Sequence, residues 1–186
     1  MDNAPDYKKY LEEDLKAMKI QLPKGILSKI KFKLSTPSTL HYIIQLRRTE
    51  QLLSIKDKNL ITKIRTKFAF KRLRKLGFLL SYEIHPFSFG PGLSLYHNGI
   101  IVNSKVKAGK NCTLRAYSVI GSKTVGDLEF CPQIGDNVDI GCNCSVIGGI
   151  KIGDNVTVGA GSVVVTDLPS NSICVGNPAK VVKFKE

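Results

Sequence analysis

The sequence predicts a mostly β protein, a parallel β-helix of hexapeptide repeats preceded by an α-helical region. The first observation is a run of six-residue blocks over residues 134–164, which reads IGDNVD, IGCNCS, VIGGIK, IGDNVT and VGAGSV. Each block opens with an aliphatic residue, and a residue that can pack inward follows four positions later. A fixed short period is typical of a β-helix, in which short strands follow one another around a coil. The second observation is a change near residue 81, where glycine, asparagine and β-branched residues replace a Lys-rich sequence.

Residues 1–80 are predicted to form a basic helical region. Apolar residues recur at helical spacing over residues 7–19, 38–54 and 58–76, which predicts three helices. Residues 26–34 are interpreted as a short basic stretch, and Gly77 as the end of the third helix. The region holds 19 Lys and Arg against 7 Asp and Glu, so it carries nearly all of the net charge of +13. This split indicates two regions with different roles.

The basic face of the predicted helix 58–76 allows two interpretations. It is either the solvated face of a helix that packs through its apolar stripe, or a surface that contacts anionic lipid headgroups or an acidic polymer. Nucleic acid is not expected as a partner, because interleaved aromatic residues and recognisable binding motifs are missing. The second interpretation would place the protein at the inner face of a membrane.

Composition bounds the location and the metal chemistry. No stretch reaches the ~18 uncharged apolar residues of a membrane span. The first residues are too charged for a secretory signal, so a cytoplasmic location is expected. The five cysteines are an odd number without CxxC spacing. We interpret them as small buried residues in a reducing compartment and expect no metal site.

The six-residue grid extends back from the regular blocks to residue 84, with two defects. Its openers are Ile84, Gly90, Tyr96, Val102, Ala108, Leu114 and Ile120. Gly90 and Tyr96 are poor openers, so the first coil is expected to be irregular or shifted by one residue. The 14 residues from Ile120 to Ile134 are not a multiple of six, so residues 121–133 are expected to leave the coil as a loop. Extruded loops often carry binding residues. We therefore predict a β-helix over 81–168 and a C-terminal cap over 169–186.

Several motifs resemble those of the hexapeptide-repeat acyltransferases, in the serine acetyltransferase-like branch. They are EIHP leading into LYHNG, the looped-out segment, the repeated IGDNV, VGAGSVV, and VGNPAKVV. The resemblance covers about residues 84–182, whereas the N-terminal half matches only in its helical character. It implies a left-handed parallel β-helix, homotrimers and acetyl-CoA as the co-substrate. The handedness comes from the resemblance alone, because crossover connections are usually right-handed.

The resemblance also implies a catalytic pair. The family's catalytic histidine lies in the motif that LYHNG resembles, which indicates His97, and its acidic partner precedes Ile-His-Pro, which indicates Glu83. Serine acetyltransferases have aspartate there, and the separation here is about one residue shorter. A histidine suits acetyl transfer, because a base must take the hydroxyl proton during attack on the thioester. His85 and His41 are interpreted as structural or surface residues.

For CoA, the resemblance implies backbone groups that follow the corner glycines and a pair of lysines. The carried-over positions are Gly121, Ser122, Cys142 and Ala160, with Lys123 and Lys180 as possible phosphate contacts. The glycines that precede two of them, Gly141 and Gly159, are equally well explained as residues that turn corners.

The acceptor is expected to be a sugar. Serine acetyltransferases end the looped segment in Arg-His-Pro, which helps to hold serine, whereas this chain has Phe130, Cys131 and Pro132. Similar segments with cysteine there resemble those of enzymes that O-acetylate capsular or lipopolysaccharide sugars. The predicted function is O-acetylation of a small-molecule or lipid-linked sugar. The alternatives are a serine O-acetyltransferase and a non-catalytic scaffold that binds polyanions. A carbonic anhydrase would need three histidines around zinc, and the repeat holds two.

Overall fold

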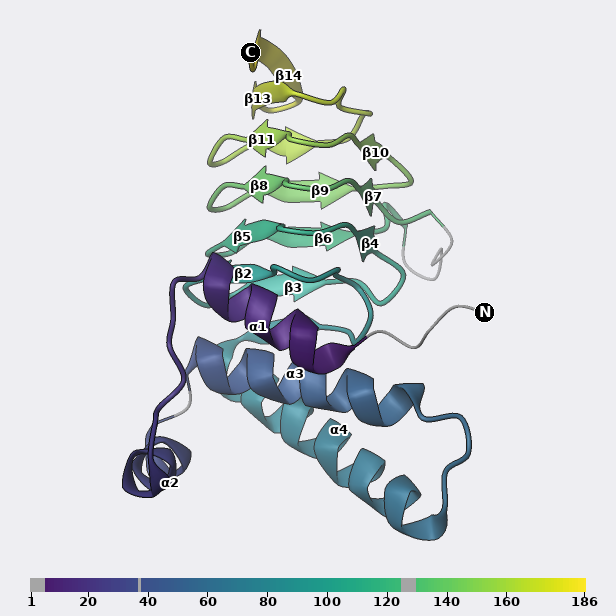
Figure 1. The fold of residues 1–186 in the computed structure, drawn as a ribbon. Coiled ribbons are helices and arrows are strands. Elements are labelled where there is room, and N and C mark those ends of the chain that lie inside the picture. The colour runs from purple at the N-terminus through teal and green to yellow at the C-terminus, as the bar shows by residue number, and fades with distance from the viewer. Residues whose placement is uncertain (1–5, 37, 125–129) are drawn as a thin grey trace.

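The computed structural model describes residues 6–36, 38–124 and 130–186. Helices form the base of the molecule, and a β-helix of stacked coils rises from them to the C-terminus (Figure 1). No helix among the described residues is long and apolar enough to cross a membrane. The chain thus has the predicted order, helices first and β-helix second.

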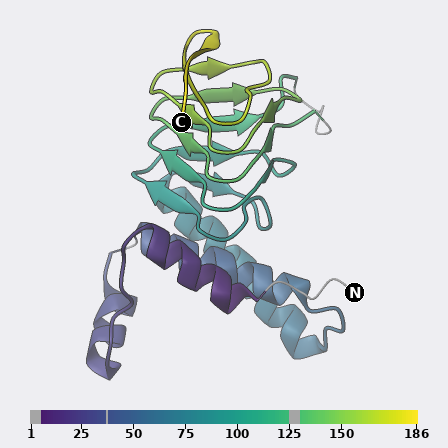
Figure 2. The same cartoon turned by 45° about the horizontal axis from the view of Figure 1, so that its top comes forward.

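In the described part of the chain, four helices make up the base: α1 (Tyr7–Ala17), α2 (Ile26–Leu34), α3 (Thr39–Ser54) and α4 (Leu60–Leu80). Side chains cap two of their starts, since Asp6 accepts from the backbone N–H groups of Lys8 and Lys9, and Asn59 accepts from Thr62. Residues 26–34, interpreted as a short basic stretch, are basic and also form α2, a helix that was not predicted. In both views this helix stands apart from the other three (Figures 1 and 2).

The predicted end of the third helix at Gly77 was wrong, because α4 continues to Leu80. Gly77 serves a close approach instead: a Cβ there would lie 2.5 Å from the carbonyl oxygen of Tyr82. The helix ends at Ser81, which adopts the left-handed conformation with φ 54°. The chain then enters the β-helix directly.

The β-helix is left-handed, and its strands stack in parallel on three faces. The first face has the order β1-β3-β6-β9-β12, the second β10-β7-β4, and the third β14-β13-β11-β8-β5-β2. The strands are β1 Tyr82–Ile84, β2 Ser94–Tyr96, β3 Ile100–Val102, β4 Lys107–Ala108, β5 Thr113–Arg115, β6 Val119–Gly121, β7 Gln133–Ile134, β8 Asp139–Ile140, β9 Ser145–Ile147, β10 Lys151–Ile152, β11 Thr157–Val158, β12 Val163–Val164, β13 Ser172–Gly176 and β14 Ala179–Phe184. Ile134 pairs with Ile152, so one coil of the regular part takes three six-residue blocks.

The openers of the regular blocks form the core of the coil, as predicted. All six are buried: Ile134, Ile140, Val146, Ile152, Val158 and Val164. Cys112 and Cys144 are buried beside them, and burial raises the pKa of the Cys112 thiol to about 11. At one corner Asn137 and Asn155 take left-handed conformations, which asparagine tolerates better than most residues. The six-residue prediction is therefore confirmed where the pattern is regular.

The first coil is shifted by one residue, one of the two expected outcomes. Phe89 and Leu95 are buried with 4% exposure each, whereas Tyr96 is 40% exposed. Leu95 pairs with Leu114, so it takes the opener's place. The register is restored in the turn that contains His97, which has φ 65°.

A buried ion cluster fixes this first coil to the helices. Arg47 of α3 is 1% exposed and donates to Asp14 of α1 (Nε–Oδ2 2.7 Å) and to Glu50 of α3 (Nη1–Oε2 2.9 Å). Arg47 also donates to the carbonyls of Phe89 and Gly90, at 3.0 and 2.7 Å. The two carboxylates accept the backbone N–H groups of two more coil residues, Leu93 and Phe87. Helix positions and the path of residues 87–93 are therefore determined together.

The β-helix ends in a hairpin. Strand β13 still pairs in parallel with β11, and β14 folds back antiparallel along β13. The hairpin lies at the end of the β-helix far from the helices (Figure 1). Residues 172–176 therefore continue the stack, and only β14 departs from it.

Candidate active site

His97 lies in the turn between β2 and β3, and its side chain is exposed. Its carbonyl oxygen accepts a hydrogen bond of 2.6 Å from the hydroxyl of Tyr82. The Thr39 hydroxyl lies 3.0 Å from that same Tyr82 oxygen. Burial raises the pKa of Tyr82, which keeps this hydroxyl a donor. The turn is thus held from the helical base, through α3 and β1.

Glu83 is the middle residue of β1 and points outward, because its neighbours Tyr82 and Ile84 are buried. It pairs with Ile101 of β3, the strand that the His97 turn enters. Among the described residues, neither the Glu83 carboxylate nor the His97 ring has a hydrogen bond or ion pair. The structure therefore brings the predicted pair to neighbouring segments of the first coil without direct contact.

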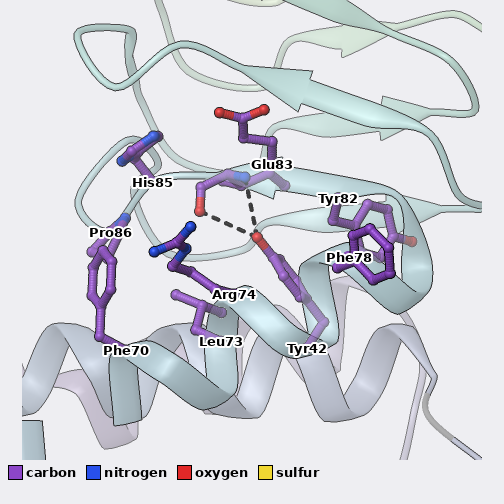
Figure 3. A pocket seen from close by; sticks show the side chains of 10 residues that line it. Tyr42, Phe70, Leu73, Arg74, Phe78, Tyr82, Glu83, His85 and Pro86 are labelled. Carbon is purple, nitrogen blue, oxygen red and sulfur yellow. Dashed lines mark hydrogen bonds between the residues drawn. The ribbon is translucent and has the colours of Figure 1, made fainter. Parts of the chain in front are cut away.

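A cavity of about 520 Å³ opens beside Glu83, between β1 and α4 (Figure 3). Its lining includes His85, the residue that follows β1. Arg74 and two aromatic residues, Phe70 and Phe78, come from α4. His97 is not part of the lining. Tyr42 forms the floor, where its hydroxyl donates to the Ile84 carbonyl (3.2 Å) and accepts from the Ile84 N–H (3.1 Å).

The predicted CoA positions fall at two edges of the face β1-β3-β6-β9-β12. Cys142 and Ala160 lie on stacked corners between β8 and β9 and between β11 and β12. Gly141 is required there, because its Cβ would lie 2.6 Å from the Ala160 nitrogen. The explanation of Gly141 as a corner residue is therefore sufficient.

The other predicted CoA positions lie elsewhere. Gly121 is the last residue of β6, so it lies at the opposite edge of that face from Cys142 and Ala160. The exposed Lys123 follows two residues later. The Ser122 hydroxyl is engaged locally, since it donates to the Thr124 carbonyl at 3.2 Å. Lys180 is exposed on β14 and pairs with Val175, within the third face. The structure thus brings Cys142 together with Ala160, and Gly121 together with Ser122 and Lys123, but does not join the two groups or add Lys180 to either.

Part of the predicted loop, residues 125–129, lies outside the described residues. Phe130 is 61% exposed and covers Gly149, where a Cβ would meet its ring at 3.0 Å. Cys131 is 3% exposed and belongs to the core. Phe130 can therefore face an acceptor, whereas the Cys131 side chain faces inward in this chain. That corrects its expected place among the acceptor contacts.

Two site residues, Arg74 and Tyr82, were missed by sequence reasoning. Arg74 was interpreted only as part of a basic face, although it stands four residues from both Phe70 and Phe78, a spacing that signals a common stripe. Tyr82 gives no sequence signal for its bond to the His97 carbonyl. His41 does have a structural role, as expected: its ring stacks on Phe32 at 3.9 Å and its Nε2 contacts the Phe32 carbonyl, which ties α2 to α3.

The region described forms no candidate metal centre, since no three His, Cys, Asp or Glu side chains gather in it. His97 and Glu83 provide a base and a carboxylate on adjacent segments. The cavity beside Glu83 provides a cation, an imidazole and aromatic walls. This set of groups can deprotonate a hydroxyl and hold a polar molecule beside it.

Comparison with known proteins agrees with the fold and the motifs. Residues 131–166 match the model of the bacterial transferase hexapeptide family (six repeats). Serine acetyltransferase 4 of Arabidopsis thaliana is 29% identical over 174 residues, which is 87% of this chain and 48% of that protein. WcaB of Escherichia coli strain K12, whose name assigns it to colanic acid biosynthesis as an acetyltransferase, is 38% identical over 106 residues, 56% of this chain and 65% of that protein. The chain thus spans about half to two thirds of these relatives.

Solved structures extend the similarity to the helical region. The crystal structure of Neisseria gonorrhoeae serine acetyltransferase has a TM-score of 0.74 and 30% identity, and covers 97% of this chain and 67% of that one. The structure of the same enzyme in complex with serine has a TM-score of 0.70 and 32% identity, and covers 95% of this chain and 69% of that one. From the repeats, the helical base and these similarities, the chain belongs to the hexapeptide-repeat transferases, in their serine acetyltransferase-like branch.

Proposed function

We propose that the protein is an acetyl-CoA-dependent O-acetyltransferase that acts on a hydroxyl of a sugar or polysaccharide precursor. The observation that carries the proposal is the His97 turn, which presents an imidazole to solvent beside the Glu83 strand in a chain whose relatives are acetyltransferases. The Tyr82 hydroxyl donates to the His97 carbonyl oxygen at 2.6 Å, so the backbone of the turn is fixed by a hydrogen bond from β1.

In the proposed reaction, the His97 imidazole accepts the proton of the acceptor hydroxyl as that oxygen attacks the acetyl carbonyl. A carboxylate on the second ring nitrogen fixes the tautomer and stabilises the imidazolium that forms. Glu83 can take this role after rotation of its exposed side chain, and its extra methylene relative to aspartate lengthens its reach. Acetyl-CoA supplies an activated acyl group, and its thiolate is a good leaving group, so no acyl-enzyme is needed. In this proposal the backbone at Gly121, Ser122, Cys142 and Ala160 holds CoA, and Lys123 and Lys180 meet its phosphates.

A sugar acceptor is supported by two observations. Phe130 and Cys131 stand where serine acetyltransferases have arginine and histidine, and Cys131 is buried. WcaB, whose name points to an exopolysaccharide, is 38% identical over the matched region. Serine is the second candidate, favoured by the 32% identity to the Neisseria gonorrhoeae enzyme in its complex with serine.

The test follows free-thiol release from acetyl-CoA with serine, hexoses and nucleotide-linked amino sugars as acceptors. We expect release with a sugar and not with serine, and loss of release in His97→Asn. Release with serine alone would support the second candidate. Full activity in His97→Asn would place the base elsewhere, and no release with any acceptor would contradict the enzyme proposal.

We also propose that the protein forms a homotrimer through the outer side of the face β1-β3-β6-β9-β12. Two apolar residues on that side are well exposed, Ile101 at 45% and Val119 at 37%, on neighbouring strands. Exposed apolar residues that adjoin one another favour an interface. Sedimentation equilibrium should give three times the chain mass of 20.5 kDa, and Val119→Lys should lower it. A monomer at micromolar concentration would contradict this assembly.

The helical base supports a further proposal, a peripheral contact of residues 58–76 with an anionic membrane. Large apolar side chains near the start of α4 are exposed among basic ones, including Ile61 at 66% and Phe68 at 67%. A basic amphipathic helix with exposed apolar residues binds anionic lipid surfaces. Co-sedimentation with phosphatidylserine vesicles should fall in the double variant Ile61→Ser, Phe68→Ser. Binding that is equal for neutral and anionic vesicles would contradict the electrostatic part. A scaffold that binds soluble polyanions would be retained on heparin and not on vesicles.

A further inference from the structure

The cavity between α4 and β1 has the chemistry of an anion-binding acceptor site. We propose that it binds the anionic group of an acidic glycan, with Arg74 as the residue that binds the carboxylate or phosphate. This proposal rests on the proposed sugar O-acetyltransferase function and names the class of acceptor. The cavity measures about 520 Å³, within the range of sites that take small organic ligands and larger than serine requires.

Arg74 is the only Lys or Arg in the lining, and its charge is not neutralised within the described part of the chain. It is exposed and forms none of the ion pairs found there. In Figure 3, the Glu83 carboxylate points away from the helix that carries Arg74. A guanidinium that faces a cavity without a partner can bind a carboxylate or phosphate through two parallel hydrogen bonds. Lys71 precedes Arg74 by one helical turn and adds positive charge on the same side of α4.

Two aromatic side chains extend the site along the helix. Phe70 and Phe78 lie four residues before and after Arg74, and Figure 3 shows the three spread along α4 with Arg74 in the middle. Phe78 is 87% exposed, although burying a phenylalanine side chain is favourable by about 1.5–3 kcal/mol. Aromatic walls with a few polar groups are the usual composition of a ligand site, and they suit the apolar face of a sugar ring.

The cavity also leads to the proposed reaction site. Glu83 lines it and belongs to the strand beside β3, which follows the His97 turn directly. An acceptor whose anionic group lies on Arg74 would therefore extend along β1 toward His97. His85 follows the other end of β1, so it can donate to or accept from a hydroxyl of a sugar unit farther from His97. This geometry gives one glycan two contacts, an anion at α4 and a reacting hydroxyl at the turn.

The anionic group could be a uronic acid carboxylate or a phosphate, and the assay separates them. Steady-state thiol release is measured with a neutral oligosaccharide, a uronic acid oligosaccharide and a nucleotide diphosphate sugar. Arg74→Gln is compared with Lys75→Gln, which removes the same charge from the next residue, exposed and outside the lining. We expect Arg74→Gln to raise the acceptor KM about 10-fold or more for the acidic acceptor that the enzyme uses, as loss of a charge-assisted hydrogen bond does. The KM for acetyl-CoA, the KM for the neutral acceptor, and the values of Lys75→Gln should stay within about 2-fold.

Binding without turnover separates failure of this proposal from failure of the proposed function. Isothermal titration of the uronic acid oligosaccharide and of the nucleotide sugar into wild type and Arg74→Gln needs no acetyl transfer. Binding that Arg74→Gln loses would support the site even if no acceptor released thiol. Equal binding of an acidic glycan by both proteins, or an equal rise in KM for neutral and acidic acceptors, would overturn the proposal, as would wild-type binding of neither acidic ligand. Retained circular dichroism of Arg74→Gln controls for folding.

Discussion

Replacement of Arg47 by methionine should destabilise the fold more than any other charge removal in the helical base. Arg47 is 1% exposed, and methionine has a similar length, so the change removes charge and hydrogen bonds with little change in volume. Five hydrogen bonds are lost: two to Asp14, one to Glu50 and two to backbone carbonyls. Two buried carboxylates then remain without a cation. Removal of one partner from a buried ion pair costs about 3–5 kcal/mol, and we expect a loss of that size.

The assay is urea unfolding followed by circular dichroism at fixed protein concentration, with Arg48→Met as the matched control. Arg48 is the next residue of α3 and is exposed, so its loss should change the free energy of unfolding by less than about 1 kcal/mol. An Arg47→Met protein as stable as Arg48→Met would refute the reasoning, because it would mean that the cluster contributes nothing that an apolar side chain cannot replace.

The pH dependence of the variant follows from the same cluster. Burial raises the pKa of Asp14 and of Glu50 above their ordinary values, while the Arg47 guanidinium lowers both. A carboxyl whose folded pKa is raised favours the folded state when protonated, so its contribution is full below the ordinary pKa and is lost as the pH rises through the folded pKa. Without Arg47 the pKa values of Asp14 and Glu50 rise further, so the stabilisation by the protonated carboxyls is lost at a higher pH. The deficit of Arg47→Met against wild type should therefore shrink between about pH 7 and pH 5, and a deficit that grew would contradict this sign.

Three further predictions concern the turn, the helix-to-strand contact and the core. Tyr82→Phe removes the 2.6 Å bond to the His97 carbonyl, so kcat should fall about 10-fold with an unchanged KM for acetyl-CoA; an unchanged kcat in thiol-release assays would contradict a positioning role. Gly77→Ala places a Cβ 2.5 Å from the Tyr82 carbonyl oxygen and should lower the free energy of unfolding in urea by about 1–3 kcal/mol, whereas Lys75→Ala should not lower it. The Cys112 thiol, buried and with its pKa raised to about 11, should react with a disulfide reagent only as the protein unfolds, and labelling in native buffer would show that the coil opens.

The sequence predicted the regular coils well because each six-residue block repeats the same local pattern. An inward aliphatic residue and a tight corner recur every six residues, so the pattern is visible without knowledge of distant contacts. The shift of the first coil could be suspected from Gly90 and Tyr96, yet its direction could not. It depends on Arg47 and Asp14, which hold the carbonyls of Phe89 and Gly90 and the N–H of Leu93 across more than 40 residues of sequence.

The helix errors have a related cause. The helix at residues 26–34 gives a weak sequence signal, because three Lys interrupt a short apolar pattern and a nine-residue helix has little intrinsic stability. Its contact with α3 through Phe32 and His41 is tertiary and gives no local signal. The extension of α4 beyond Gly77 likewise depends on the approach of Tyr82, since a glycine near a helix end is by itself a reasonable stop signal.

The candidate site shows the same division between local and tertiary information. His97 and Glu83 could be named because they stand in motifs, whereas Tyr82 and Arg74 could not, because their roles depend on where α4 meets the first coil. That junction carries the buried Arg47 cluster, the Tyr82 bond to the turn and the cavity beside Glu83. A regular β-helix has no such junction, since every coil of it contacts only further coils. The helical region therefore affects the proposed chemistry in two ways. It fixes the irregular coil that carries His97, the proposed general base, and it supplies one wall of the proposed acceptor site. Removal of the helical region should therefore impair use of the acceptor more than it disturbs the stacking of the distant coils. Those coils pair only with one another.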